Sequence, residues 1–144
     1  MLYLNDCHTS ALYQHLQTVY PAEGCGIVLG VWEETGARVM ETIATANVWM
    51  PDSMADTHSI HDRYEISPQE MLAAMKLARS KQWEIIGIYH SHPDHPARPS
   101  MCDRDLAWSQ YIYVIVSIAQ GTAAEMTAWQ LDESGEFRSI PIDS

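Results

Sequence analysis

The stretch "EIIGIYHSHPDHPARPSMCD", residues 84–103, carries an apolar segment directly into a cluster of histidines and prolines. Its first seven residues, 84–90, are rich in isoleucine and show no polar alternation, which is typical of a central, buried β-strand. Side chains two residues apart on a strand point to the same face of the sheet. We therefore expect the imidazoles of His90 and His92 to converge on one point.

A convergent histidine pair indicates a metal site. Zinc favours nitrogen ligands of this kind, and a hydrolytic zinc site has three protein ligands and a fourth position open to water. Asp103, eleven residues after His92, is the natural third ligand. The loop between them contains Pro93, Pro96 and Pro99, so it has few conformations to lose on folding and returns the chain to the metal at reduced entropic cost.

The same residues also have a purely structural interpretation. Ser100 and Asp103 fit an S-x-x-D capping pattern that would open a short helix through "DRDLAW", residues 103–108. A His-x-His pair on a strand is, moreover, more often structural than metal-binding. The capping and metal interpretations are compatible, and the pattern alone leaves both open.

Two longer helices are expected on either side of the first strands. The first spans residues 10–19, with Leu12, Leu16 and Val19 at helical spacing and Pro21 enforcing the stop. The second begins after residue 67, where the sequence "SPQE" offers a capping serine, a proline at the first helical position and a glutamate that completes a capping box. Its apolar stripe, which we expect to pack on the core, is Met71, Met75 and Ala78.

The remaining apolar segments predict β-strands. They are "CGIVLGV" (25–31), its hairpin partner "ARVMETIATANVW" (37–49), "YIYVIVSI" (111–118), "AAEMTAWQL" (123–131) and "EFRSIPI" (136–142), whereas residues 50–62 are polar and form a loop. This order predicts a mixed α/β chain of the α+β class. A mostly antiparallel central sheet is flanked by two main helices, with a short helix after the metal loop.

Length and composition set further bounds. The 144 residues contain no repeat or linker, so we expect one domain over 1–144, large enough to fold without a metal. No apolar run is long enough for a membrane span, the start "MLYLNDCHTS" is unlike a signal peptide, and the three cysteines fit reduced thiols, so a cytoplasmic protein is expected. The net charge of -11 argues against nucleic acid and anionic membranes as partners.

The segment "HSHPDHPARPSMCD", residues 90–103, fits the pattern H-[ST]-H-P-x6-S-x2-D at every position. In this it resembles the JAMM (MPN+, Mov34/PAD-1) zinc metallopeptidases. The upstream "PAEGCGIVLG", residues 21–30, is similar to the first signature of that family, and the shared order of elements extends the resemblance over nearly the whole chain. The short length and the loop "HPDHPARPS" look like the small prokaryotic branch.

The resemblance implies a role for each residue of the site. His90, His92 and Asp103 hold one Zn²⁺ per chain, Glu23 is the catalytic acid and base, and Ser100 stabilises the oxyanion. Physical chemistry agrees with these roles, because zinc can lower the pKa of a water from 15.7 to about 7 and polarise a carbonyl, while a carboxylate must still carry the proton to the leaving amine.

Other reactive side chains near these motifs receive structural interpretations. Asp94 and His95 fall in the variable x6 loop and are expected to be solvated. Cys102 lies close to the metal in sequence, but the family does not fix that position, so its thiol is expected to be incidental. His58 and His61 form an HxxH pair in a loop without further ligands, and a second metal site is not expected there.

Some members of the prokaryotic branch act on ubiquitin-like sulfur-carrier proteins. The resemblance therefore implies a peptidase or isopeptidase that hydrolyses an amide bond at the C-terminal tail of such a carrier; the sequence does not decide between the two bonds and does not indicate an oligomeric state. One alternative is a non-catalytic MPN-type scaffold, although such relatives typically lose metal ligands. The other is a RadC-like, DNA-linked protein, against which the acidic balance and the opening "PxExCG" both count.

A carrier tail that ends in glycines offers no side chains to a pocket. Recognition near the scissile bond is therefore expected to use main-chain hydrogen bonds along an exposed strand edge. The folded body of the carrier is expected to dock on residues 50–62 and 94–99, because loops on a rigid scaffold are where binding residues concentrate.

Overall fold

The protein is described over residues 1–144 by a computed structural model, which contains eight strands and three helices. In chain order they are β1 (Leu2–Tyr3), α1 (Asp6–Val19), β2 (Cys25–Glu33), β3 (Gly36–Thr45), α2 (Pro68–Ser80), β4 (Glu84–Pro93), α3 (Met101–Leu106), β5 (Ile112–Ala119), β6 (Thr122–Leu131), β7 (Phe137–Ile140) and β8 (Ile142–Asp143). None of the helices is both long and apolar enough to cross a membrane.

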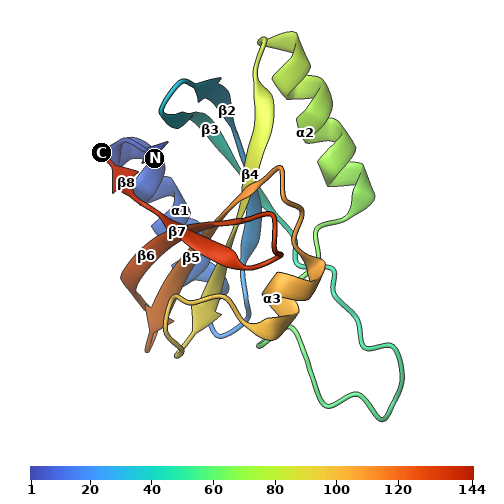
Figure 1. Ribbon diagram of the computed structural model, residues 1–144. Helices are drawn as coiled ribbons and strands as arrows, with labels where there is room; N and C mark the ends of the chain where they lie inside the picture. Colours follow the sequence, from blue (N-terminus) through green and yellow to red (C-terminus); the bar gives the residue numbers. More distant parts are fainter.

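All eight strands join one sheet in the order β7-β6-β5-β4-β2-β3-β1-β8. The predicted central strand, β4, runs antiparallel to β2 and parallel to β5. The hairpins β2–β3, β5–β6 and β6–β7 are antiparallel, so the predicted α+β class and mostly antiparallel sheet are confirmed. Because β7 and β8 stand at opposite ends of this order and only Pro141 separates them in sequence, the sheet curls back on itself (Figure 1).

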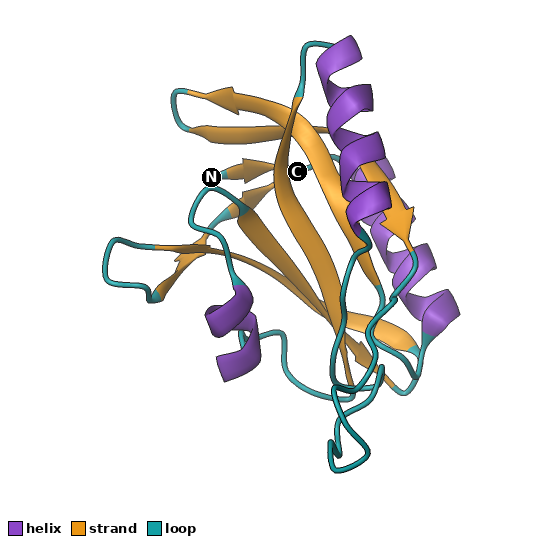
Figure 2. Cartoon of the chain, turned by 90° about the vertical axis from the view of Figure 1, so that its right-hand side faces the viewer, coloured by secondary structure: helices purple, strands orange, loops and turns teal.

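The two long helices cover opposite faces of the curled sheet (Figures 1 and 2). Leu12 and Leu16 of α1 are buried in the larger core, together with apolar residues from six strands. Ala74 and Ala78 of α2 pack on Ile27, Leu29 and Ile88 in a smaller core on the other face. Since Ile88, His90 and His92 alternate along β4, the two histidines emerge on the α2 face, beyond the end of the smaller core.

The predicted helices need three corrections. The first helix begins at Asp6 rather than Ser10, because the Asn5 side chain caps it by accepting a hydrogen bond from the His8 N–H. In α2, Met75 is 51% exposed, so the buried stripe is carried by the alanines and not by this methionine. The capping box is only half formed, because Glu70 accepts from the Ala46 N–H instead of returning to residue 67.

The strand boundaries differ from the prediction where side chains or proline interrupt the ladder. β3 ends at Thr45 rather than Trp49, since the Asn47 amide donates to the carbonyl oxygens of Glu23 and Arg63 and accepts from the Trp49 N–H. Residues 136–142, predicted as one strand, form β7 and β8. The strand is divided because Pro141 has no N–H to donate, and the chain changes its pairing partner there from β6 to β1. β1 was not predicted, as two residues carry too little pattern.

Candidate metal centre

The antiparallel register of β2 and β4 brings two distant parts of the sequence together. Cys25, the first residue of β2, is paired with His90 near the end of β4. The segment before β2 therefore runs beside the end of β4. The contact is fixed by two hydrogen bonds: the Gly24 N–H donates to Ser91 Oγ at 2.9 Å, and the Ser91 N–H donates to the Gly24 carbonyl at 3.0 Å. Glu23 is held next to His92 as a result.

Three side chains meet at the end of β4, and each presents one metal-binding atom within 4.8 Å of the others: His90, His92 and Asp103. The two Nε2 atoms are 3.2 Å apart, and Asp103 lies 3.3 Å from His90 Nε2 and 3.1 Å from His92 Nε2. His90 is fully buried and His92 is 8% exposed. The predicted triad is thus assembled in space.

The donor chemistry of this group fits a cation. His92 Nδ1 lies 3.0 Å from the Pro96 carbonyl oxygen. Because a carbonyl only accepts, Nδ1 carries a proton; in the neutral ring the Nε2 lone pair therefore faces Asp103 and His90, whereas in the protonated ring Nε2 donates to Asp103. His90 Nδ1 is buried without a partner, a cost that a cation bound at Nε2 would offset. Two imidazole nitrogens and a carboxylate match the ligand set of a catalytic zinc site.

Burial and mutual contact shift the pKa values of His90, His92 and Asp103. Burial lowers the pKa of His90 below its ordinary value of 6.5. Burial would also lower the pKa of His92, but its hydrogen bond to Asp103 and the charge of that carboxylate raise it overall. Burial would raise the pKa of Asp103, yet the facing His90 and the hydrogen bonds from both histidines and the Ser100 N–H hold it well below 3.8. Asp103 is therefore an anion at neutral pH.

The short helix α3 places both Ser100 and Asp103. Ser100 Oγ accepts the Asp103 N–H at 3.0 Å, and Asp103 Oδ2 accepts the Ser100 N–H at 2.9 Å, so the predicted capping box is complete. The same Oδ2 also faces His92, so the cap and the metal group share one carboxylate. The Ser100 hydroxyl proton has no protein acceptor and remains free to donate outwards.

Glu23 lies beside the triad and is almost fully buried. It is 6% exposed, and no protein group donates a hydrogen bond to its carboxyl. Burial raises the pKa of this carboxyl to about 8, with the positive influence of His92 opposing the rise. Its backbone is fixed on both sides, because the N–H donates to the Ile60 carbonyl and the carbonyl accepts from Asn47. The geometry suits a group that exchanges a proton near neutral pH.

Two residues that support the site, Tyr64 and Asn47, were not predicted from the sequence. The Tyr64 ring stacks on His90 with a centroid distance of 4.5 Å and fixes the plane of that imidazole. Asn47 ties the Glu23 carbonyl to the loop by joining it to the Arg63 carbonyl. Both residues lie in or beside a polar loop without periodicity, so no local pattern marked them. Their positions follow from tertiary contacts alone.

Two pockets open beside Glu23. One has a volume of about 360 Å³ and is largely apolar; it is lined by Glu23, Asp103 and Cys102 together with side chains that include Trp49, Tyr64, Met71, Leu106, Trp108 and Tyr113. The other, of about 300 Å³, has no hydrophobic lining residue and includes His92 and Ser100. Glu23 therefore lies between an apolar and a polar pocket.

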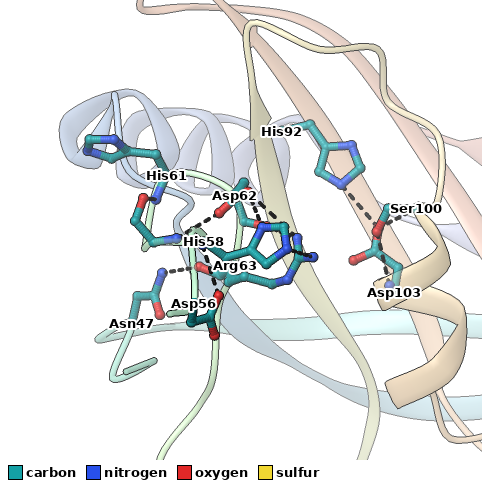
Figure 3. A network of polar contacts seen from close by, with 10 residues as sticks. Asn47, Asp56, His58, His61, Asp62, Arg63, His92, Ser100 and Asp103 are labelled. Atoms are coloured by element: carbon teal, nitrogen blue, oxygen red, sulfur yellow. Dashed lines mark hydrogen bonds and ion pairs between the residues drawn. The ribbon is translucent and has the colours of Figure 1, made fainter. Parts of the chain in front are cut away.

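The remaining candidates lie around this cleft. His58 pairs with Asp62 at 2.7 Å and faces Arg63, and this loop cluster lies opposite His92, Ser100 and Asp103 (Figure 3). His61 contributes to the polar pocket but joins no second ligand group. Cys102 is half-buried and lines the apolar pocket.

Asp94 and His95 of the x6 loop are exposed, as expected, but Asp94 is not simply solvated. Asp94 has a positive φ of 58° and accepts hydrogen bonds from the Tyr20 hydroxyl and the Gln120 N–H, so it fixes the turn after β4. His95 is exposed and lines the polar pocket.

Comparison with known proteins places the chain in an established group. A family model described as prokaryotic homologues of the JAB domain matches residues 6–132. A desampylase of Haloferax volcanii is 32% identical over 125 residues, covering 85% of this chain and 78% of its own length. A desampylase of Pyrococcus furiosus is 30% identical over 79 residues, or 55% of this chain and 54% of its own length.

Solved structures give the same result for the fold. The solution structure of a Desulfitobacterium hafniense protein superposes with a TM-score of 0.81 at 25% identity, covering 99% of this chain and 91% of the other. A Salinibacter ruber protein superposes with a TM-score of 0.73 at 33% identity, covering 99% and 90%.

Proposed function

Because the chain belongs to the family of prokaryotic JAB domain homologues and is a hydrolase of the JAMM type, we propose that it uses zinc to cleave an amide bond at the C-terminal tail of a ubiquitin-like protein. The observation that carries the proposal is the convergence of His90, His92 and Asp103 beside a buried Glu23. The name of the two relatives, desampylase, supports the same substrate class.

Each residue of the centre has a chemical part in this proposal. His90, His92 and Asp103 would hold the Zn²⁺, which supplies Lewis acidity that activates water and polarises the scissile carbonyl. Glu23 takes the proton from the attacking water and delivers it to the leaving nitrogen, because its carboxyl is buried beside the ligand triad. Ser100 donates its free hydroxyl proton to the carbonyl oxygen as negative charge develops there.

The polypeptide around the centre suits an extended tail. β2 and β4 are each paired on both sides, so neither of these two strands offers the expected edge. The exposed main chain there belongs to the loop between β3 and α2 and to residues 94–99. We expect these two segments to bind the tail and to contact the folded body of the carrier. The loop projects away from the sheet (Figure 1), as a contact surface for a second protein would.

The two alternatives are less well supported. A non-catalytic scaffold does not require a buried carboxyl beside an intact ligand triad. A DNA-linked function is disfavoured by the net charge of -11.

The three unpaired cysteines fit a reducing cytoplasm as the place of action.

The proposal is tested by incubating the zinc-loaded protein with ubiquitin-like sulfur carriers that are extended by one residue or joined to a lysine. Mass spectrometry of the products should show cleavage directly after the carrier tail, faster than cleavage of unstructured peptides of the same tail sequence. Equal rates on such peptides would contradict docking of the carrier body. Absence of cleavage of every carrier would refute the substrate class.

A further inference from the structure

The proline-rich loop that follows β4 is held against the sheet by hydrogen bonds from side chains. The carbonyl oxygens of residues 95, 96 and 97 each accept one such bond. In chain order of the carbonyls, the donors are Ser117 Oγ at 2.7 Å, His92 Nδ1 at 3.0 Å and Thr127 Oγ1 at 2.6 Å. The carbonyl that holds the proposed zinc ligand His92 therefore stands between two carbonyls that are fixed by hydroxyls.

The register of the sheet places both hydroxyls on the face that carries the metal group. Ser117 of β5 is paired with His92 of β4. Thr127 of β6 is paired with Ile115, whose partner on β4 is His90. Paired residues of neighbouring strands point to the same face of a sheet. The loop therefore lies across β5 and β6 next to the two histidines.

A third side chain fixes the direction of the bond from Thr127. The Trp129 Nε1–H donates to Thr127 Oγ1 at 2.8 Å, and an indole nitrogen can only donate. The hydroxyl proton of Thr127 is thus directed to the Ala97 carbonyl, which can only accept. Ala97 is fully buried. Loss of this donor would leave its carbonyl without a partner, at a cost that favours a shift of the loop.

A shift of the loop would reach the metal group through Pro96. Its carbonyl also accepts the Arg98 N–H at 2.9 Å, so its position depends on the backbone of the loop. The bond from His92 Nδ1 to this carbonyl aims Nε2 at Asp103 and His90. The partner of the second ring nitrogen orients a metal-binding histidine, and its loss typically lowers metal affinity about 10- to 100-fold.

We propose that Ser117 and Thr127 are positioning residues of the metal centre: their hydroxyls hold the loop so that Pro96 keeps His92 in the orientation that a bound metal requires. Neither hydroxyl is hydrogen-bonded to a proposed ligand, so both act through the backbone of residues 95–97. Neither residue belongs to the H-[ST]-H-P-x6-S-x2-D pattern. The inference rests on the zinc centre of the proposed function and adds two residues to it.

The first test measures zinc affinity by competition with a chromophoric chelator. Thr127→Val keeps the shape of the side chain but lacks the hydroxyl, and it should bind zinc several-fold more weakly than wild type. The Ser117→Ala/Thr127→Val variant should bind about tenfold more weakly. Thr127→Ser keeps the hydroxyl and should restore the wild-type affinity.

Two further variants serve as controls and should bind zinc as wild type does. Thr122→Val is the same change at an exposed residue of β6. Val39→Ala truncates a side chain of the larger core and controls for a loss of stability that does not involve the loop.

The second test does not require metal. In zinc-free protein with isotope-labelled histidine, NMR measures how fast the His92 Nδ1 proton exchanges with water. Protection from exchange should be present in wild type and Thr127→Ser and lost in the Ser117→Ala/Thr127→Val variant. Unchanged protection or unchanged zinc affinity in this double variant would overturn the inference, as would zinc binding by Thr127→Ser as weak as that by Thr127→Val. Absence of zinc from wild type would refute the proposed function instead, and the exchange rates would still decide whether the two hydroxyls orient His92.

Discussion

Glu23 shows how a single residue acquires chemistry from its surroundings. In sequence it is a loop acid before a strand, but in the structure it is 6% exposed, and its carboxyl accepts no hydrogen bond from the protein. Burial is the main cause of its raised pKa of about 8. A carboxyl with this pKa holds and releases a proton near neutral pH, as an acid and base in hydrolysis must.

Glu23→Gln should retain zinc and lose most turnover, because the change removes the proton acceptor and leaves the three proposed ligands in place. We expect a fall of kcat by about 10²-fold or more. Metal analysis and steady-state kinetics on the same preparation check this. Parallel loss of zinc would instead place Glu23 among the ligands.

The same substitution should change the pH dependence of stability in the zinc-free protein. The folded pKa of Glu23, about 8, lies above its ordinary value of 4.5. The fold therefore favours the protonated form, and the carboxyl destabilises it increasingly as the pH rises between these values. Glu23→Gln should raise the free energy of unfolding by about 4 kcal/mol at pH 8 and leave it nearly unchanged at pH 4. Urea denaturation at the two pH values measures this, and an equal effect at both would contradict burial as the cause.

At the scale of elements, the site depends on the pairing of β2 with β4 and on one short helix. Pairing of Cys25 with His90 sets Glu23 beside His92, and Ser91 locks this register through its contacts with Gly24. The S-x-x-D pattern predicted the cap of α3, and the structure shows that the same carboxylate serves cap and triad. The capping and metal interpretations therefore describe one arrangement. The position of Glu23 was not evident from local pattern, because it follows from register between strands far apart in sequence.

Ser91→Ala should reduce turnover while zinc is retained, since the Gly24 N–H loses its buried acceptor and the Glu23 segment is no longer tied to β4. A buried donor left unpaired costs about 1–3 kcal/mol. Ser91→Thr keeps the hydroxyl and should restore activity. Ser80→Ala, whose exposed hydroxyl caps the end of α2, is the control and should behave as wild type. An Ser91→Ala enzyme with unchanged kcat would show that this bond does not position Glu23.

At the scale of the whole molecule, we expect the fold to form without the proposed metal, because neither apolar core includes its ligands. Two apolar cores, one on each face of the sheet, hold the helices in place. Apolar periodicity and turn residues predicted the α+β class and located six of the strands, although β3 ends at Thr45 rather than Trp49 and the predicted closing strand divides at Pro141. The short strands β1 and β8 were not predictable, because two residues form a strand only when tertiary pairing presents an edge to them. Met75 was misjudged since the close approach of α2 to the sheet favours the small Ala74 and Ala78.

The zinc content of the purified protein, compared with that of the His92→Ala/Asp103→Ala variant, tests the central claim most directly. Wild type expressed with ample zinc should carry about one zinc per chain after dialysis, because three convergent ligands make the site. The double variant should carry essentially none, and its circular dichroism should remain that of a folded protein, because neither core includes these side chains. Zinc in wild type no higher than in the folded double variant would contradict the account.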